Sequence, residues 1–253
     1  MIDTPHRRFN PLTRDWVLVS PQRARRPWQG QVEKTSSEKL PPYDPDCYLC
    51  PGNERAGGVR NPHYTGTFVF DNDFSALLPD ASEPDSAPPH PLLASSPERG
   101  LCRVVCFSPR HDLTLPELDS FAIENVLATW TRESADLGAK DFIQYAQVFE
   151  NKGALMGCSN PHPHSQIWAQ SQLPNEISRE LASQSAYFEE HRRPLLSDYL
   201  AEEHHLLERI VFQNDSFTAL VPFWAVWPFE VLLVAYRPAA YLADLTSAEV
   251  SAL

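Results

Sequence analysis

Two histidines and a glutamine occupy alternate positions in the segment NPHPHSQIW, residues 160–168. In a strand, His162, His164 and Gln166 would project from one face, because successive side chains alternate between the two faces. Three such polar side chains are costly to bury without hydrogen-bond partners. A proline between the histidines also confines the strand to an edge, a bulge or a site. The pattern therefore indicates a functional site at which imidazole acts as a catalyst or a metal ligand.

The segment just before this motif, ENKGALMGCSN over residues 150–160, is rich in small residues. Gly153 and Gly157 flank a predicted turn between two strands, where backbone N–H groups and Asn or Ser side chains could meet an oxyanion or a phosphate. Most glycine turns only reverse the chain, so this signal has weight only beside the histidine motif.

A second metal-binding pattern is Cys47-x-x-Cys50, which has the spacing of two ligands but no second copy in the chain. By itself it is incidental, a redox pair, or half of a tetrahedral zinc site. His111 and one histidine of the HPH motif are candidates for the two nitrogen ligands. Cys102 and Cys106 alternate within an apolar strand pattern, and we expect both thiols to be buried in the core.

The composition excludes several classes of protein. The chain has 253 residues, of which 42% are hydrophobic and 21% charged, as in globular enzymes. No apolar run reaches the roughly 18 residues of a membrane span, and the N-terminal residues lack the apolar core of a signal peptide. Five cysteines, an odd number, argue against a disulfide framework. We therefore expect a cytoplasmic protein with no membrane partner.

The charge distribution gives a further indication. The net charge of −12 argues against nucleic acid as a partner. Six arginines but only two acidic residues occur in the first 26 positions. This basic segment is either a solvated tail or a place where a small anion is held.

The surrounding pattern predicts an α+β fold of strands and packed helices. A capping box at Thr114–Glu117 predicts the start of a helix whose apolar face includes Val126 and Leu137. Helical patterning returns from residue 175 to about 207. The strands that the pattern predicts lie at 16–20, 67–70, 101–107, 142–150, about 162–169, 210–213, 217–221 and 230–235.

Together these motifs resemble the galactose-1-phosphate uridylyltransferase family of the histidine-triad superfamily. The resemblance runs in order along nearly the whole chain. At the third position of the triad, where hydrolase branches have a histidine, this chain has Gln166, which resembles the transferase branch. Besides residues 150–166, the segments that carry it are HRRFNPLT (6–13), SPQRARRPWQG (20–30), YTG (64–66), FDNDF (70–74), LPNE (173–176) and PFWAVWPF (222–229).

For the fold, the resemblance implies a histidine-triad-like half-barrel sheet with packed helices, in two similar units. Residues 1–170 would form the catalytic unit, and residues 171–253 the start of a second, incomplete one. For function, it implies a homodimer that exchanges UMP between UDP-glucose and galactose 1-phosphate. The exchange would follow a ping-pong mechanism through a uridylylated histidine.

The resemblance also implies roles for individual residues. His164 would be the nucleophile that attacks the α-phosphorus, and Gln166 would donate a hydrogen bond to a non-bridging phosphate oxygen. The other implied contacts are Arg23, Arg26, Asn151 and Ser159 for phosphate, and Asn72 and Asp73 for uridine and ribose.

Two metal sites are implied in the same way. The ligands of a structural zinc ion would be Cys47, Cys50, His111 and His162. Glu180 would be one ligand of a second metal, often iron, whose histidine partners in the family lie beyond residue 253. His191, His204 and His205 do not match those partners.

The last residues raise the question of completeness. A capping box at Thr246–Glu249 predicts the start of a helix with Val250 and Leu253 on one face, but the sequence stops within two turns. Because so short a helix is marginal on its own, we expect a fragment of a longer protein. Two alternatives to the transferase stay open. One is another histidine-triad nucleotidyl transferase or phosphorylase, and the other is an inactive zinc-stabilised fragment. A zinc-ribbon nucleic-acid module fits least well with the net charge of −12.

Overall fold

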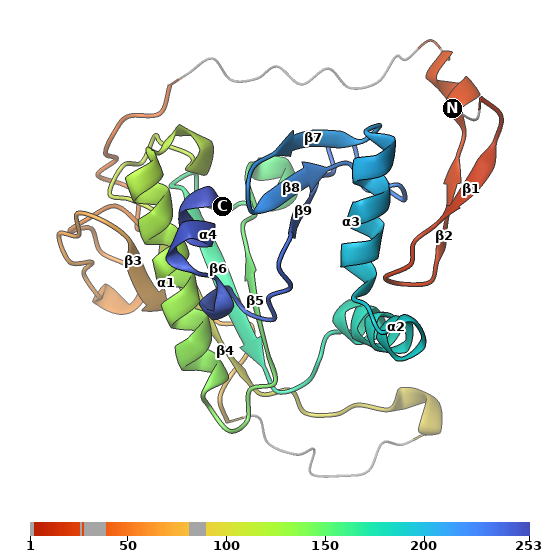
Figure 1. The fold of residues 1–253 in the computed structure, drawn as a ribbon. Coiled ribbons are helices and arrows are strands. Elements are labelled where there is room, and N and C mark those ends of the chain that lie inside the picture. The colour runs from red at the N-terminus through yellow and green to blue at the C-terminus, as the bar shows by residue number, and fades with distance from the viewer. Residues whose placement is uncertain (1–2, 26, 28–38, 81–89) are drawn as a thin grey trace. The chain divides into compact units, whose positions relative to one another are not determined.

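The computed structural model describes residues 3–25, 27, 39–80 and 90–253, which form two compact units (Figure 1). We call Ser36–Leu173 the central unit, and Met1–Thr35 together with Pro174–Leu253 the terminal unit. Each unit combines antiparallel strands with helices. The predicted α+β class is therefore confirmed.

The central unit is built on a four-stranded antiparallel sheet with the strand order β3-β4-β6-β5. The strands predicted in this region are confirmed, with shifted ends; β6 begins at His164, so His162 lies outside the strand, contrary to prediction. Pro163, which has no N–H group for the ladder, directly precedes it. The bounds of the four strands are β3 Phe68–Asp71, β4 Gly100–Cys106, β5 Tyr145–Phe149 and β6 His164–Gln170.

The two faces of this sheet are covered differently. Helix α1 (Ser120–Gly138) packs on one face, where Val105 and Ile167 join a buried cluster with Leu137 of the helix. Figure 1 shows α1 lying along the sheet. On the other face, Cys106 packs in a second buried cluster with Cys47 and Cys50, which lie in the loop before β3. Cys102 and Cys106 are both buried, as predicted.

The predicted helix boundaries need correction. The capping box at Thr114 closes only a 3₁₀ turn, Leu115–Glu117, and α1 starts later behind its own N-cap, Asp119, which accepts from Ala122 N at 2.8 Å. The pattern over 175–207 is divided into two helices, because Arg192 adopts a left-handed conformation with φ of 58° just before Pro194. No helix of the described ranges is both long and apolar enough to cross a membrane.

Among its described residues, the terminal unit contains a hairpin, a three-stranded antiparallel sheet and three α-helices. Its buried residues include Leu12, Leu195 and Trp224. The predicted capping box is confirmed, because the Thr246 hydroxyl accepts from Glu249 N at 3.2 Å. The first strand was not predicted. The elements are β1 His6–Phe9, β2 Trp16–Val19, α2 Asn175–His191, α3 Leu195–Leu206, β7 Ile210–Gln213, β8 Phe217–Leu220, β9 Leu232–Ala235 and α4 Ser247–Ala252.

Candidate metal centre and active site

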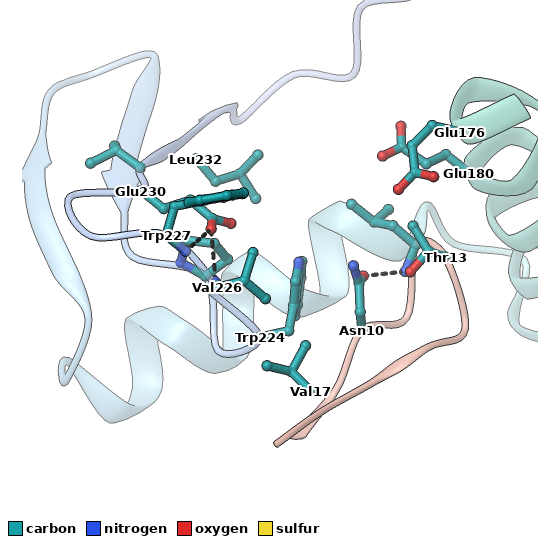
Figure 2. A pocket seen from close by; sticks show the side chains of 13 residues that line it. Asn10, Thr13, Val17, Glu176, Glu180, Trp224, Val226, Trp227, Glu230 and Leu232 are labelled. Carbon is teal, nitrogen blue, oxygen red and sulfur yellow. Dashed lines mark hydrogen bonds between the residues drawn. The ribbon is translucent and has the colours of Figure 1, made fainter. Parts of the chain in front are cut away.

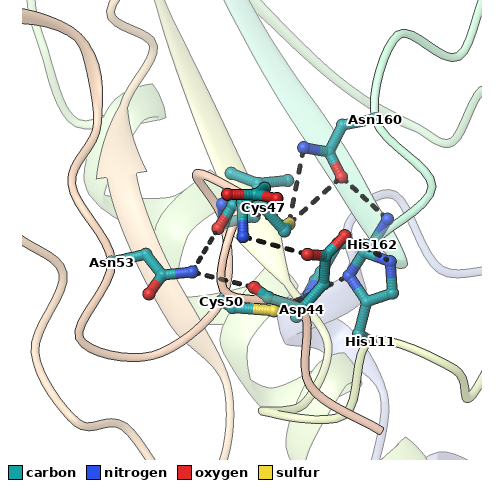
Figure 3. Close-up of polar contacts among 9 residues, drawn as sticks. Asp44, Cys47, Cys50, Asn53, His111, Asn160 and His162 are labelled. Atoms are coloured by element: carbon teal, nitrogen blue, oxygen red, sulfur yellow. Dashed lines mark hydrogen bonds and ion pairs between the residues drawn. The ribbon is translucent and has the colours of Figure 1, made fainter. Parts of the chain in front are cut away.

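Four metal-binding side chains are buried together in the central unit (Figure 3). One ligand atom from each lies within 4.8 Å of the others, and we call the group Cys47, Cys50, His111 and His162 the Cys₂His₂ cluster. The Sγ atom of Cys50 lies 3.6 Å from Nδ1 of His111 and 3.5 Å from Nδ1 of His162. Two thiols and two imidazoles are a donor set for a tetrahedral metal ion. The cluster could therefore hold a metal, and His162 supplies the ligand from the HPH motif.

A tight turn presents the two thiols. The backbone N–H of Cys50 donates to the Cys47 carbonyl at 3.1 Å, and the N–H of Leu49 donates to Cys47 Sγ at 3.4 Å. The side-chain amide of Asn53 donates to the Cys47 carbonyl at 2.8 Å. These bonds hold both sulfurs on one side of the loop, as a shared ion would require.

Hydrogen bonding sets the tautomer of His162. Its Nε2 lies 3.1 Å from the carbonyl oxygen of Ser108, which can only accept, so Nε2 carries the proton. The lone pair is then on Nδ1, which faces Cys50 Sγ. Burial lowers the pKa of His162 to about 4, so the ring is neutral near pH 7, the form that binds a metal. Burial also raises the pKa of the Cys50 thiol to about 11, which makes the thiolate costly to form. A bound cation would offset that cost.

The second histidine of the motif lies in a separate, small cavity of about 30 Å³. Nδ1 of His164 lies 2.7 Å from the carbonyl oxygen of His162. Because that oxygen can only accept, Nδ1 is the donor and Nε2 keeps a lone pair. The residues that line the cavity are Phe149, Asn151, Gly157, Cys158, Ser159, His164 and Gln166.

The predicted turn of small residues forms one wall of this cavity. Gly153 and Gly157 have φ angles of 86° and 83°, in the left-handed region that favours glycine. A 3₁₀ turn, Ala154–Met156, lies between them. The turn leads Asn151 and Ser159 to the cavity that contains His164, so the sequence correctly grouped these residues in space.

The structure brings Gln166 and Asn72 together, two residues that the resemblance assigned to one site. The side-chain amide of Asn72 donates to Oε1 of Gln166 at 3.3 Å. The indole N–H of Trp168 donates to the same oxygen at 3.1 Å. Trp168 lies two residues along β6 from Gln166, and sequence reasoning missed it although the period of the strand could have found it.

Asp73 already has a strong partner. One guanidinium nitrogen of Arg55 lies 2.9 and 3.0 Å from the two carboxylate oxygens of Asp73, and the guanidinium stacks 3.8 Å from the centroid of the Phe70 ring. Sequence reasoning also missed Arg55. Arg23 lies in a 3₁₀ turn of the terminal unit, Pro21–Arg25, while Arg26 lies outside the described residues. Their roles stay predictions.

Glu180 borders a different cavity, of about 320 Å³, within the terminal unit (Figure 2). Figure 2 shows its carboxylate beside that of Glu176, one turn earlier on α2. Burial raises the pKa of Glu180, and the charge of Glu176 adds to the effect. Among the residues that the structure describes, no group of metal-binding atoms gathers around Glu180. His204 instead bonds Thr218, with 2.8 Å between Nε2 and Oγ1.

Comparison with known proteins agrees with this geometry. The family models described as galactose-1-phosphate uridyl transferase, N-terminal and C-terminal domain, match residues 1–174 and 180–253. The galactose-1-phosphate uridylyltransferase of Haemophilus influenzae is 53% identical over 242 residues, which are 96% of this chain and 68% of the relative. That of Rattus norvegicus is 49% identical, over 96% of this chain and 64% of the relative.

Solved structures share the fold. A uridylyltransferase structure is 28% identical, with a TM-score of 0.73, and the match covers 97% of this chain and 70% of that one. An ADP-glucose phosphorylase from Arabidopsis thaliana, solved with bound ADP-glucose, has the same TM-score of 0.73 at 24% identity, covering 98% of this chain and 73% of that one. At that identity the second likeness concerns the fold alone.

Proposed function

The chain belongs to the galactose-1-phosphate uridyl transferase family, and on that premise we propose that it transfers UMP between UDP-glucose and galactose 1-phosphate. In the first half-reaction, Nε2 of His164 forms a bond to the α-phosphorus of UDP-glucose, and glucose 1-phosphate leaves with the electrons of the broken P–O bond. In the second, a phosphate oxygen of galactose 1-phosphate attacks the same phosphorus. The N–P bond breaks, and UDP-galactose is released.

The observation that carries this proposal is the bond of 2.7 Å between His164 Nδ1 and the His162 carbonyl. Because Nδ1 holds the proton, Nε2 is the nucleophilic nitrogen, and it needs no base to activate it. The carbonyl dipole also stabilises the positive charge that spreads over the ring as the N–P bond forms. A histidine held in this way suits a covalent intermediate.

The neighbouring polar groups suit a phosphoryl group. Gln166, Asn151 and Ser159 border the same cavity as His164 and are neutral donors. A neutral amide binds a phosphoryl oxygen without acting as a general acid for water, which favours transfer over hydrolysis. Uridine and ribose would be held by Asn72 and Asp73, and further phosphate contacts would come from Arg23 and Arg26.

We assign the Cys₂His₂ cluster to a structural zinc ion. Zn–S bonds of about 2.3 Å and Zn–N bonds of about 2.0–2.1 Å at a tetrahedral angle separate sulfur from nitrogen by about 3.6 Å. The separations of Cys50 Sγ from the two Nδ1 atoms, 3.6 and 3.5 Å, fit that value. Zinc there would fix His162, whose carbonyl holds the nucleophile. Glu180 stays a candidate ligand of a second metal, often iron, whose histidine partners in the family lie beyond residue 253.

The remaining parts of the proposal rest on the composition, the net charge and the family resemblance. The chain would act in the cytoplasm and as a homodimer, without nucleic acid or a membrane as partner. Residues 1–170 would be the histidine-triad-like catalytic unit, and 171–253 part of the second unit.

The experiment is a UMP exchange assay. Purified protein is incubated with UDP-glucose and galactose 1-phosphate, and UDP-galactose and glucose 1-phosphate are measured. His164→Ala should abolish the exchange, while His205→Ala, an exposed histidine on α3, should not change it. Equal exchange by His164→Ala would refute the role of His164. ADP-glucose in place of UDP-glucose tests the alternative of an adenylyl-specific transferase or phosphorylase.

A further inference from the structure

We propose that Trp168 is a positioning residue that fixes which end of the Gln166 amide meets the phosphoryl group. This inference rests on the proposed UMP transfer, in which Gln166 donates to a phosphoryl oxygen. Trp168 does not line the cavity of His164, so it would act only through Gln166. Its indole N–H donates to Gln166 Oε1 at 3.1 Å.

The donors around Gln166 leave one orientation of the amide. An indole N–H can only donate, so the atom opposite it must be the oxygen of the amide. Asn72 is fixed in the same sense, because its Oδ1 accepts from the backbone N–H of Phe74 at 2.9 Å and its Nδ2 therefore faces Gln166, at 3.3 Å. Both lone pairs of Gln166 Oε1 are thus occupied. The NH₂ group is the donor that remains for a ligand.

The orientation matters for the chemistry. A flipped amide would turn its oxygen toward a phosphoryl oxygen. The partial negative charge of the amide oxygen and the charge of the phosphoryl oxygen would then repel each other, with no hydrogen between them. Without the Trp168 donor, only the longer bond from Asn72 would remain to hold Oε1 in place. The indole is itself held by the Phe149 ring, whose centroid lies 5.5 Å away at an interplanar angle of 83°. Phe149 also pairs with Gln166 across β5 and β6. Trp168 is therefore a rigid donor.

Trp168→Phe tests the proposal, because it keeps an aromatic ring and removes only the N–H donor. The chain offers a matched control on the other face of the same strand. There the indole of Trp130 donates to the Ser165 hydroxyl at 2.7 Å, and Trp130→Phe removes an equivalent bond. We expect Trp168→Phe to slow single-turnover formation of the uridylylated enzyme by about three- to tenfold. Trp130→Phe should leave that rate unchanged, with both variants similar in thermal stability.

A double-mutant cycle separates positioning from a general structural role. In a Gln166→Ala background, Trp168→Phe should slow uridylylation less than twofold further, since its target is already gone. An unchanged rate in Trp168→Phe, or the same fold-loss in both backgrounds, would overturn the proposal. If Trp168→Phe melts well below Trp130→Phe, Trp168→His, which retains a ring N–H, takes its place. A rate for Trp168→His no faster than for Trp168→Phe would also overturn it.

The two proposals fail in different ways. If UMP transfer is wrong, the wild-type protein forms no uridylylated enzyme from UDP-glucose. If only the role of Trp168 is wrong, the wild-type protein is labelled normally and Trp168→Phe is labelled at the same rate.

Discussion

His162 and His164 are two residues apart, and the structure holds them in opposite tautomers. His162 donates from Nε2 to the carbonyl of Ser108 and turns Nδ1 to the thiol of Cys50. His164 donates from Nδ1 to the carbonyl of His162 and leaves a lone pair on Nε2. The first ring is 0% exposed, and the second is partly exposed in a cavity. The same side chain is thus suited to bind a metal in one place and to react with a substrate in the other.

The difference shows how two adjacent regions divide the work. In the Cys₂His₂ cluster the polar atoms face one another, so the region is closed to a substrate. In the cavity, the His162 carbonyl fixes the ring of His164 and the Trp168 indole fixes the amide of Gln166, and each of these two side chains keeps one polar group available. The role of each histidine is therefore decided less by the residue type than by the carbonyl oxygen that its ring N–H meets.

The largest effect that tests this comparison comes from exchanging the two histidines for alanine in turn. His162→Ala removes a metal ligand and should lower the free energy of unfolding of the central unit by about 5 kcal/mol or more, since structural zinc contributes roughly 10–16 kcal/mol in zinc-finger peptides. His164→Ala should keep its metal and change that free energy by less than about 1 kcal/mol. Metal analysis and chemical denaturation measure both effects.

A single pattern of results would break the comparison. If His164→Ala lost its metal and unfolded as readily as His162→Ala, the two regions would be one structural site. His205→Ala serves as the control for purification and handling, because that residue is exposed on α3.

A smaller effect should distinguish an asparagine that stabilises the Cys₂His₂ cluster from one that lines the cavity of His164. Asn160 is 4% exposed, and its Oδ1 accepts from the His162 N–H at 2.8 Å. Asn160→Ala should therefore lower the free energy of unfolding by about 1–3 kcal/mol, because it leaves a buried N–H without its acceptor.

Asn151, which is exposed at the cavity, is the matched comparison. Asn151→Ala should leave the stability unchanged and slow UMP exchange by roughly tenfold or more, as expected for a lost bond to a charged oxygen. The division fails if both variants lose stability equally while exchange stays normal.

The smallest effect concerns acid, and it distinguishes the central unit from the terminal unit. Hydrogen bonds from Arg237, then from the Thr246 backbone, lower the pKa of Glu249 from 4.5 to about 2. The unfolded chain therefore takes up this proton first as the pH falls, so the stabilisation is complete above pH 4.5 and is lost through about pH 2.

Glu249→Gln should remove this small loss of stability between pH 4.5 and 2, measured as thermal melting against pH. Release of metal from the Cys₂His₂ cluster, by protonation of its ligands, should have the same pH dependence in Glu249→Gln and in the wild type. A shift of that release in the variant would contradict the independence of the two sites.

The sequence predicted the parts of the fold that depend on local pattern. The alternation over residues 101–107 found β4, and the spacing of Val126 and Leu137 found the buried face of α1. The capping box at Thr114 misplaced the start of α1, because Leu118 returns to extended geometry with ψ of 151° before Asp119 caps the helix. Local patterns do not reveal such an interruption.

The site divides in the same way. The spacing of His162, His164 and Gln166 indicated a site, but strand period alone placed His162 on the wrong element. The spacing of Cys47 and Cys50 offered half of a zinc site, with His111 and one histidine of the motif as candidate ligands. Only the resemblance implied the complete set with His162, since its members come from distant parts of the chain. The contact of the Tyr64 hydroxyl with His162 Nε2, at 3.3 Å across 98 residues, was not predicted for the same reason. Contacts of that kind depend on tertiary packing.

The most direct measurement is the site of covalent labelling. UDP-glucose that carries ³²P in the phosphate next to uridine is mixed with the enzyme in the absence of galactose 1-phosphate, and the labelled peptide is identified. We predict one acid-labile label per active site, on His164, that galactose 1-phosphate removes as labelled UDP-galactose. The His164→Ala variant, with its metal retained, should take up none. Label on another residue, or full UMP exchange without any label, would contradict the assignment of His164 as the nucleophile.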